Sequence, residues 1–297
     1  MRLAITGATG LVGHFVVEEA LAAGDAVLTL ARTPPAPGRF SAPVERARFD
    51  LTEDPPPLAG CDALIHLGFS HLPGRYRGGE GDDPEGFRRA NLDGTLRLFE
   101  AARRDGVERI LFLSSRAVYG DYPPGTRLTE QLPPRPDTLY GAVKLQAEQA
   151  LAKMHAPGLA TASLRATGVY GPPGPGQRHK WADLFEEFRD GRNIAPRVAS
   201  EVHGADLAVA IRLLLTAPPD LLGGRSFNVS DMLLDRRDLL AELAALTGIT
   251  TPLPDRGNAA CVSRMTCTRL RSLGWQPGGI DRLRASLPAM LPPMPPP

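Results

Sequence analysis

The chain has 297 residues, of which 23% are charged and 42% hydrophobic, and its formal net charge is +1. This length allows one large α/β domain or two smaller lobes with a substantial core. The balanced charge offers no basic surface for nucleic acid, and the apolar runs are too short to span a membrane. We therefore expect neither a nucleic-acid nor a membrane partner.

The cysteines and the two ends of the chain bear on its location. The chain has three cysteines, Cys61, Cys261 and Cys267, which cannot all pair with one another and lack zinc-type spacing. We therefore expect neither a disulfide framework nor a metal site. The first residues run directly into a strand and a glycine loop and leave no room for a signal peptide, which predicts a cytoplasmic location. The proline-rich tail at 291–297 is expected to be frayed.

Short apolar runs alternate with helical patterns through the first two thirds of the chain. This alternation predicts a doubly wound parallel sheet of the Rossmann type, with helices on both faces and ligands at the carboxyl ends of the strands. The predicted strands are Arg2–Thr6, Ala26–Ala31, Ala47–Asp50, Asp62–Leu67, Arg109–Ser114 and Ala160–Arg165, and the predicted helices are Leu11–Ala23, Phe87–Arg104 and Leu139–Met154.

The pattern changes after Arg165, where helices dominate. We predict helices at Trp181–Arg189, Asp206–Leu215 and Arg236–Leu246 and a strand at Arg225–Val229. The expected division is a dinucleotide-binding domain over 1–170, to which 203–230 returns, and a smaller, mostly helical substrate lobe. That lobe comprises 171–202 and 231–290 and is expected to close over the crevice at the strand ends.

Three glycines follow the first predicted strand and open the first predicted helix. In this context Gly7 allows a tight turn, Gly10 lets the backbone approach a phosphate, and Gly13 lets helix and strand pack closely. Glycine triplets are common in turns, but the position between a strand and an amphipathic helix predicts a dinucleotide site with the pyrophosphate at the helix N-terminus.

The end of the second predicted strand bears on the choice between NADP and NAD. The acidic residue that holds the adenosine ribose of NAD is replaced there by Arg32. A guanidinium can bind a 2′-phosphate and stack on adenine, so the sequence slightly favours NADP. The alternative is that Arg32 is a solvated loop residue and that NAD is the cofactor.

Tyr140 and Lys144 lie four residues apart on one predicted helix, so they share a face. An ammonium beside a phenol favours the phenolate, which suits Tyr140 to act as a general base. Ser115, at the end of a predicted strand about 25 residues upstream, adds a hydroxyl to hold a substrate oxygen. Together these three residues predict hydride transfer at a carbinol or ketone.

Further motifs extend this pattern along nearly the whole chain. With them the sequence resembles the extended branch of the short-chain dehydrogenase/reductase superfamily, the NAD-dependent epimerase/dehydratase family. The motifs are Gly7-Ala-Thr-Gly10-Leu-Val-Gly13, Asp50-Leu51, Asp62-Ala-Leu-Ile-His66-Leu-Gly68, Asn91-Leu-Asp-Gly94-Thr95, Ser114-Ser115-Arg-Ala-Val118-Tyr119-Gly120, Arg165 with Tyr170-Gly171-Pro172, His203-Gly-Ala-Asp206-Leu-Ala208, Phe227-Asn228-Val229 and Leu273-Gly274-Trp275.

The resemblance implies a set of site residues. Ser115, Tyr140 and Lys144 are the expected catalytic residues, and Asn91 supports a water relay. The cofactor is expected to contact Gly7, Thr9, Gly10, Leu11, Val12, Gly13, Arg32, Asp50, Leu51, Leu67, Gly68, Asn91, Tyr140 and Lys144. Candidate substrate contacts are Ser70, Arg116, Tyr119, Tyr170 and His179.

Two departures from the family pattern concern the substrate. Sugar-nucleotide members usually carry a glycine-rich turn and an arginine in the stretch that corresponds to Asn193–Glu201. Here this stretch contains Arg197 but is short and without the turn, which puts a nucleoside-diphosphate clamp in doubt. The residues after Ser115 lack the acidic pair of the dehydratases, so elimination chemistry is not expected.

We therefore predict an NAD(P)-dependent oxidoreductase or epimerase acting on a secondary alcohol or ketone of a sugar-like substrate. The alternatives are a sugar-nucleotide epimerase with tightly bound NAD and a non-catalytic dinucleotide-sensing regulator. Outer apolar positions at Leu96, Phe99, Leu145 and Leu151, together with the resemblance, suggest a homodimer through a four-helix contact.

Overall fold

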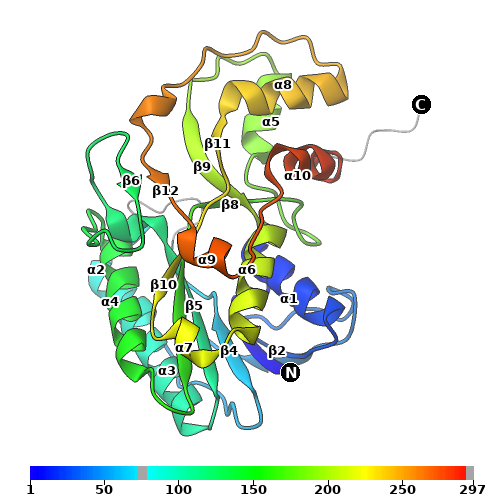
Figure 1. Ribbon diagram of the computed structural model, residues 1–297. Coiled ribbons are helices and arrows are strands. Elements are labelled where there is room, and N and C mark those ends of the chain that lie inside the picture. Colours follow the sequence, from blue (N-terminus) through cyan, green and yellow to red (C-terminus); the bar gives the residue numbers. More distant parts are fainter. Residues whose placement is uncertain (72–78, 292–297) are drawn as a thin grey trace.

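The computed structural model describes residues 1–71 and 79–291 (Figure 1). Its main sheet has seven strands, all parallel to their neighbours, in the order β10-β7-β5-β4-β1-β2-β3. The strand order reverses between β1 and β4, which places the ligand crevice of a doubly wound fold at that point. The strands are β1 Arg2–Thr6, β2 Ala26–Ala31, β3 Glu45–Arg48, β4 Ala63–His66, β5 Arg109–Ser115, β7 Ala160–Ala166 and β10 Ser226–Val229.

The strands of this sheet are apolar runs because helices cover both of its faces. Every residue of β7 is buried, whereas the edge strand β3 is mostly exposed and reads Glu-Arg-Ala-Arg. Charged residues at such an edge oppose pairing with a second sheet. The structure therefore confirms the predicted sheet, and the strand predicted at Arg225–Val229 forms its other edge as β10.

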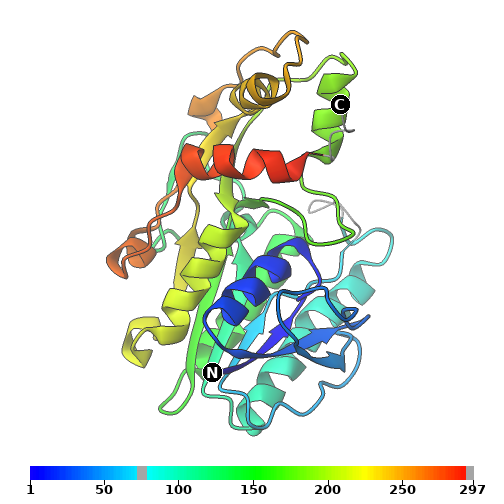
Figure 2. The same ribbon diagram turned by 90° about the vertical axis from the view of Figure 1, so that its right-hand side faces the viewer.

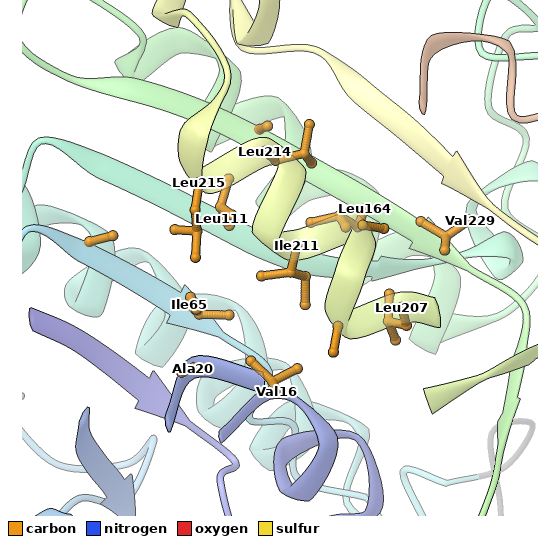
Figure 3. Packing of buried hydrophobic residues seen from close by; sticks show 14 of the residues in the cluster. Val16, Ala20, Ile65, Leu111, Leu164, Leu207, Ile211, Leu214, Leu215 and Val229 are labelled. Atoms are coloured by element: carbon orange, nitrogen blue, oxygen red, sulfur yellow. The ribbon is translucent and has the colours of Figure 1, made fainter. Parts of the chain in front are cut away.

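Helices α1 (Leu11–Ala22) and α6 (Gly204–Thr216) lie side by side on one face of the sheet. The opposite face carries α2 (Pro84–Arg88), α3 (Gly94–Arg104) and α4 (Leu139–Met154) (Figures 1 and 2). Figure 3 shows side chains of α1 and α6 against those of β4, β5 and β7. Each fully buried aliphatic side chain there contributes roughly 1.5–3 kcal/mol; they include Val16, Ile65, Leu111, Leu164, Leu207, Ile211 and Leu214.

The long helix predicted over Phe87–Arg104 is interrupted in the structure. It starts at Pro84, where the Asp83 carboxylate accepts a hydrogen bond from Gly86 N (2.7 Å). A π-helical turn over Arg89–Asp93 then separates α2 from α3. An apolar pattern alone does not distinguish such a turn from an α-helix, and π-turns often accompany functional sites.

The region from residue 168 onward contains strands that the sequence analysis did not predict. A three-stranded sheet is formed by β8 (Gly168–Tyr170), β9 (Val198–His203) and β11 (Met232–Asp235). In β9 the polar residues Ser200, Glu201 and His203 are buried, so the alternation that marks a half-buried strand is hidden. Helices α5 (Ala182–Arg189), α8 (Arg236–Thr247) and α10 (Gly279–Ser286) accompany this sheet in the upper part of Figure 1.

The remaining elements are short. They are the parallel pair of β6 (Arg127–Leu128) and β12 (Arg264–Met265), and helices α7 (Pro219–Leu222) and α9 (Thr268–Ser272). Across residues 1–71 and 79–291, every helix is too short or too polar to cross a bilayer. All but the first residue of the proline-rich tail, 292–297, lies outside the described residues.

Candidate active site

The glycine loop between β1 and α1 is built by close backbone approaches. Gly7 has a φ of +67°, and a Cβ there would lie 2.9 Å from Gly68 N, so β1 and β4 meet tightly at their carboxyl ends. A Cβ on Gly13 would overlap the Gly7 carbonyl and lie 2.6 Å from the Ala8 Cα. Only glycine fits at these two positions, as the strand–loop–helix pattern predicts.

The N-terminus of α1 suits a pyrophosphate. Its N-cap is Gly10, which is exposed, and neither a capping side-chain hydrogen bond nor an acidic residue occurs in its first turn. The amide N–H groups and the positive end of the helix dipole are therefore available to an anion. The predicted contacts Thr9, Leu11 and Val12 are partly exposed in the same loop. The residues present thus fit a dinucleotide.

A buried polar chain fixes the floor beneath this loop. The Thr6 hydroxyl accepts hydrogen bonds from Leu67 N (3.1 Å) and Gly68 N (2.9 Å) and bonds His66 Nδ1 (2.6 Å). The other ring nitrogen of His66 bonds the Thr95 hydroxyl (2.9 Å). Burial, together with the charge of Lys144, lowers the pKa of His66 to about 3. His66 is therefore a neutral structural residue that holds the turn after β4, next to Gly7.

A glycine lets the helix that carries Tyr140 approach the turn after Ser115. A Cβ on Gly141 would lie 2.5 Å from Ala117 O, so the first turn of α4 packs on the turn that follows Ser115. The Ser115 hydroxyl accepts a hydrogen bond from Ala117 N (3.1 Å). One lone pair is used by this bond, and the hydroxyl proton remains available to a substrate oxygen.

Lys144 lies beneath Tyr140 in an aromatic cage. Its ammonium donates to Leu113 O (2.7 Å) and lies 4.3 Å from the Phe69 ring centre and 4.6 Å from that of Phe112. The Tyr140 ring centre is 6.0 Å from the same ammonium. Burial lowers the pKa of Lys144 to about 7, although the nearby Glu148 charge opposes the shift. The cage and the carbonyl fix the position of this ammonium.

Asn91 binds the protein's own backbone in this structure. Its side-chain amide donates to Ser70 O (2.7 Å) and Phe87 O (3.0 Å), and its oxygen accepts from Ser70 N (2.6 Å). The π-helical turn therefore clamps the segment after β4, including Phe69 and Ser70, over the site. These contacts give Asn91 a clamping role, and the water relay expected through it stays a prediction.

The residues expected to surround adenine lie at neighbouring strand ends. Arg32 is exposed just after β2, and its positive charge is one of the causes that lower the pKa of Asp50. The largest cause is the hydrogen bond from Thr52 N to the Asp50 carboxylate (2.9 Å). Leu51 is buried, and its carbonyl accepts from Arg97 Nη2 (2.8 Å). The structure thus brings Arg32, Asp50 and Leu51 to one edge.

Several candidate substrate residues point elsewhere. Tyr119 is fully buried, and its hydroxyl donates to Asn228 Oδ1 (2.8 Å) and Thr129 O (3.0 Å). Tyr170 is also fully buried and stacks on Trp181, with ring centres 4.8 Å apart. Neither phenol lies on a surface that a substrate reaches, so we leave both out of the site.

Arg116 and His179 are engaged by the protein as well. Arg116 donates to Ser263 O (3.2 Å), and burial lowers its pKa. The Nδ1 atom of His179 accepts from Trp181 N (3.3 Å), and burial followed by the charge of Arg178 lowers its pKa. These contacts give both side chains local structural roles.

The sequence analysis missed Phe69, Phe112, Thr6, Gly141 and Thr95 as parts of the site. Gly141 carried a signal, because a glycine in a helix next to a candidate base usually marks a close approach. The aromatic cage carried none, since its rings come from different strands and loops.

The chain matches the model of the NAD dependent epimerase/dehydratase family over residues 3–230. This match covers most of the chain, and the seven-stranded sheet and glycine loop agree with it. The chain belongs to this family.

Individual relatives differ in activity. The chain is 37% identical to a uronate dehydrogenase of Agrobacterium fabrum over 157 residues, which are 52% of the chain and 55% of that protein. It is 27% identical to a UDP-glucose 4-epimerase of Streptomyces lividans over 93% of the chain and 92% of that protein. In the match to the dehydrogenase and to several further curated relatives, the chain spans about half of their length.

A solved structure similar to this one is that of MoeE5 in complex with UDP-glucose and NAD. The TM-score is 0.76 at 26% identity, with 98% of this chain and 97% of that chain covered. The likeness therefore extends to the β8–β9–β11 sheet and its helices.

Proposed function

We propose that the protein is an NAD(P)-dependent oxidoreductase or epimerase that acts by hydride transfer on a secondary alcohol or ketone of a sugar or sugar-like substrate. One observation carries this proposal. The first turn of α4, which carries Tyr140, packs through Gly141 on Ala117 O in the turn after Ser115, and the caged Lys144 ammonium lies 6.0 Å from the Tyr140 ring centre. A base, a hydroxyl donor and a fixed cation thus converge next to a loop that fits a dinucleotide.

Each residue has a distinct task in the proposed reaction. Ser115 Oγ donates to the substrate oxygen and holds it toward Tyr140. The Tyr140 hydroxyl takes the proton from a carbinol or returns it to a ketone, and the Lys144 ammonium stabilises the negative charge on the phenol oxygen. The bound nicotinamide supplies the hydride acceptor or donor.

Replacement of Tyr140 by Phe tests this assignment. We expect the turnover number to fall by about 10²–10⁴-fold, because the proton loses its acceptor, while dinucleotide affinity is kept. The readout is the absorbance of reduced nicotinamide with a panel of free aldoses, uronates and UDP-sugars. The matched control is Tyr122→Phe, whose hydroxyl only donates to Pro133 O. Full activity of Tyr140→Phe would show that Tyr140 is not the proton acceptor, whereas an unchanged role of this variant in vivo would favour a non-catalytic dinucleotide-sensing regulator.

We further propose that NADP is the preferred cofactor, supported by the exposed Arg32 at the end of β2. Arg32→Ala should lower catalytic efficiency with NADP(H) about tenfold and leave that with NAD(H) nearly unchanged, because only NADP has the 2′-phosphate. A wild-type preference for NADH would contradict the proposal.

Mass spectrometry of the dinucleotide released from the denatured protein separates net redox chemistry from epimerisation. Loosely held or absent NADP(H) supports an exchangeable cosubstrate and a reductase or dehydrogenase. Tightly held NAD⁺ supports an epimerase that regenerates its cofactor within each turnover.

The finer organisation belongs to the same proposal. We propose a cytoplasmic homodimer, with 1–170 and the returning 203–230 binding the cofactor and 171–202 with 231–290 binding substrate. Of the residues suggested for the dimer contact, Phe99 and Leu151 are buried in the core, and Leu96 and Leu145 are half-buried. A monomeric mass by light scattering at micromolar protein would count against the dimer.

A further inference from the structure

A cavity of about 260 Å³ lies in the upper part of the molecule among α5, β9, β11 and α8. Its wall combines apolar side chains such as Leu184 and Leu234 with charged ones, including Lys180 and Glu201. A pocket with apolar walls and a few fixed polar groups is typical of a small-molecule site.

Lys180 and Glu201 form an ion pair in the wall of this cavity. The Lys180 ammonium donates to Glu201 Oε2. A Cβ on Gly168 would lie 2.5 Å from that oxygen and would also overlap the ammonium, so the pair fills the space beside Gly168.

The position of Gly168 relates this pair to the catalytic residues. It is the second residue after Ala166, which is in register with Ser115 across the sheet. Two residues of extended chain span about 7 Å, so Gly168, and with it the pair, lies beyond the strand ends at which Ser115 is found.

The pair has unused hydrogen-bonding capacity. The side chain of Glu201 is 5% exposed and that of Lys180 is 31% exposed, and both residues line the cavity. The bond between them uses one of three ammonium N–H groups and one of two carboxylate oxygens. Neighbouring hydroxyls of a sugar can accept from the ammonium and donate to the carboxylate.

We propose that Lys180 and Glu201 recognise adjacent hydroxyls of a neutral sugar ring whose reacting carbon reaches Ser115 and Tyr140; this rests on the proposed oxidoreductase function. The pair is neutral as a whole, and its buried carboxylate repels an anion close to the ammonium. A carboxylate or phosphate on the ring is therefore disfavoured at this position.

The opposite end of the cavity determines what the ring is attached to. Arg197 precedes β9, and its four-residue separation from Glu201 corresponds to roughly 13 Å along an extended chain. Arg197 and Arg236 both line the cavity. A free sugar leaves these cations to solvent, whereas a nucleotide-linked sugar brings its phosphates to them. The neutral ring is common to the free sugar and the nucleotide-linked sugar.

The test compares neutral sugars with their uronates, which differ only in a hydroxymethyl group against a carboxylate. The pairs are glucose with glucuronate, galactose with galacturonate, and UDP-glucose with UDP-glucuronate. Binding to the full-length protein with NAD(P)⁺ is measured by calorimetry, and turnover by reduced nicotinamide. The wild type should bind the neutral member of at least one pair tenfold or more tightly. The sugar–uronate pair that shows this preference tells whether the bound sugar is free or nucleotide-linked.

Glu201→Gln provides the decisive variant. Loss of a hydrogen bond to a charged group should weaken neutral-sugar binding about 10-fold or more, and the neutral-to-uronate affinity ratio should fall because the repelling carboxylate is gone. Lys180→Met should weaken binding of both members. The matched control is Glu186→Gln. Glu186 lies on α5 and pairs with the exposed Arg178, so this substitution should change neither the neutral-sugar affinity nor the neutral-to-uronate affinity ratio.

A wild-type preference for the uronate, an unchanged ratio in Glu201→Gln, or no binding in any pair would overturn the proposal. Neutral-sugar binding that depends on Glu201 without turnover supports this site and rejects the proposed oxidoreductase. Turnover together with an unchanged neutral-to-uronate affinity ratio in Glu201→Gln supports the proposed oxidoreductase and rejects this sugar site.

Discussion

At the scale of single residues, close backbone approaches decide where the chemical groups of the site lie. Gly7, Gly13 and Gly141 each occupy a position where a Cβ would meet main-chain atoms. Main chain moves far less readily than a flexible side chain, so such contacts fix the neighbouring groups. The side chain of His66 is also held in place, because its two ring nitrogens bond the hydroxyls of Thr6 and Thr95 within the core.

Gly141→Ala is expected to impair catalysis more than binding. The added methyl must push α4 away from Ala117 O, which separates Tyr140 from Ser115. A displacement of about 1 Å costs roughly 10²-fold in rate. We expect that loss in the turnover number with near-normal dinucleotide affinity. Gln149→Ala, exposed on the same helix, is the control, and equal activity of the two variants would refute the argument.

His66 predicts a specific loss of stability in acid. Its pKa is about 3 in the folded protein, below the ordinary value of 6.5. As the pH falls below 6.5, the unfolded chain takes up a proton that the folded chain refuses. The free energy of unfolding therefore decreases, by about 2–3 kcal/mol between pH 6.5 and 4.5 from this residue.

Urea unfolding of wild type and His66→Gln at several pH values checks this. The variant is expected to be less stable at neutral pH because two buried hydrogen bonds change. Its stability should nevertheless decline less steeply toward pH 4.5. Parallel curves for the two proteins would show that His66 does not cause the acid sensitivity.

At the scale of elements, two loops hold the glycine loop from outside the sheet. Arg39, after β2, donates to Thr9 O (2.9 Å) and to Pro175 O (3.0 Å). Gln177, after β8, also donates to Thr9 O (2.5 Å). These bonds connect segments 168 residues apart and tie the loop after β8 to the nucleotide loop.

Arg39→Met is expected to release the dinucleotide faster, because the loop after β8 keeps its bond from Gln177 to Thr9 O but loses the second connection through Arg39. Stopped-flow fluorescence of reduced nicotinamide should show a dissociation rate roughly 5- to 10-fold higher, the effect of one charge-assisted hydrogen bond. Arg103→Met, in an exposed pair with Glu100, serves as the control. An unchanged dissociation rate would mean that the loop closes without Arg39.

At the scale of the whole molecule, a buried ionic network joins the main sheet to later segments. Arg165 on β7 bonds Glu148 on α4 through Nε (3.1 Å) and Nη2 (2.7 Å), and also bonds the Tyr119 hydroxyl (3.1 Å). Asn228 on β10 accepts from that hydroxyl and donates to Thr266 O (3.0 Å). The network thus connects β7 and β10 with α4 and with the segment after β12.

Glu148→Gln is expected to destabilise the fold by about 3–5 kcal/mol, because it leaves the Arg165 charge buried without its partner. Urea unfolding measures this. Glu242→Gln, in an exposed pair with Arg284, should cost no more than about 1 kcal/mol. Similar losses of unfolding free energy in the two variants would show that burial does not determine how much the Arg165–Glu148 pair contributes to stability.

The sequence by itself determined the fold class, the glycine loop and the Tyr140–Lys144 pair. These are local patterns: a strand followed by a glycine turn, or a spacing of four on one helix, has the same geometry wherever it occurs. The boundaries of β1, β2 and α4 were predicted residue for residue for the same reason.

Only the tertiary structure decided which side chains meet across the chain. Three features involve segments that are distant in sequence or that fold back on themselves. They are the clamp by Asn91, the contacts that bury Tyr119 and the Lys180–Glu201 pair. Their contacts depend on the packing of whole elements, which leaves no periodic trace. The proposed catalytic residues can therefore be predicted from local spacing, whereas the residues proposed to bind the substrate are brought together by long-range packing.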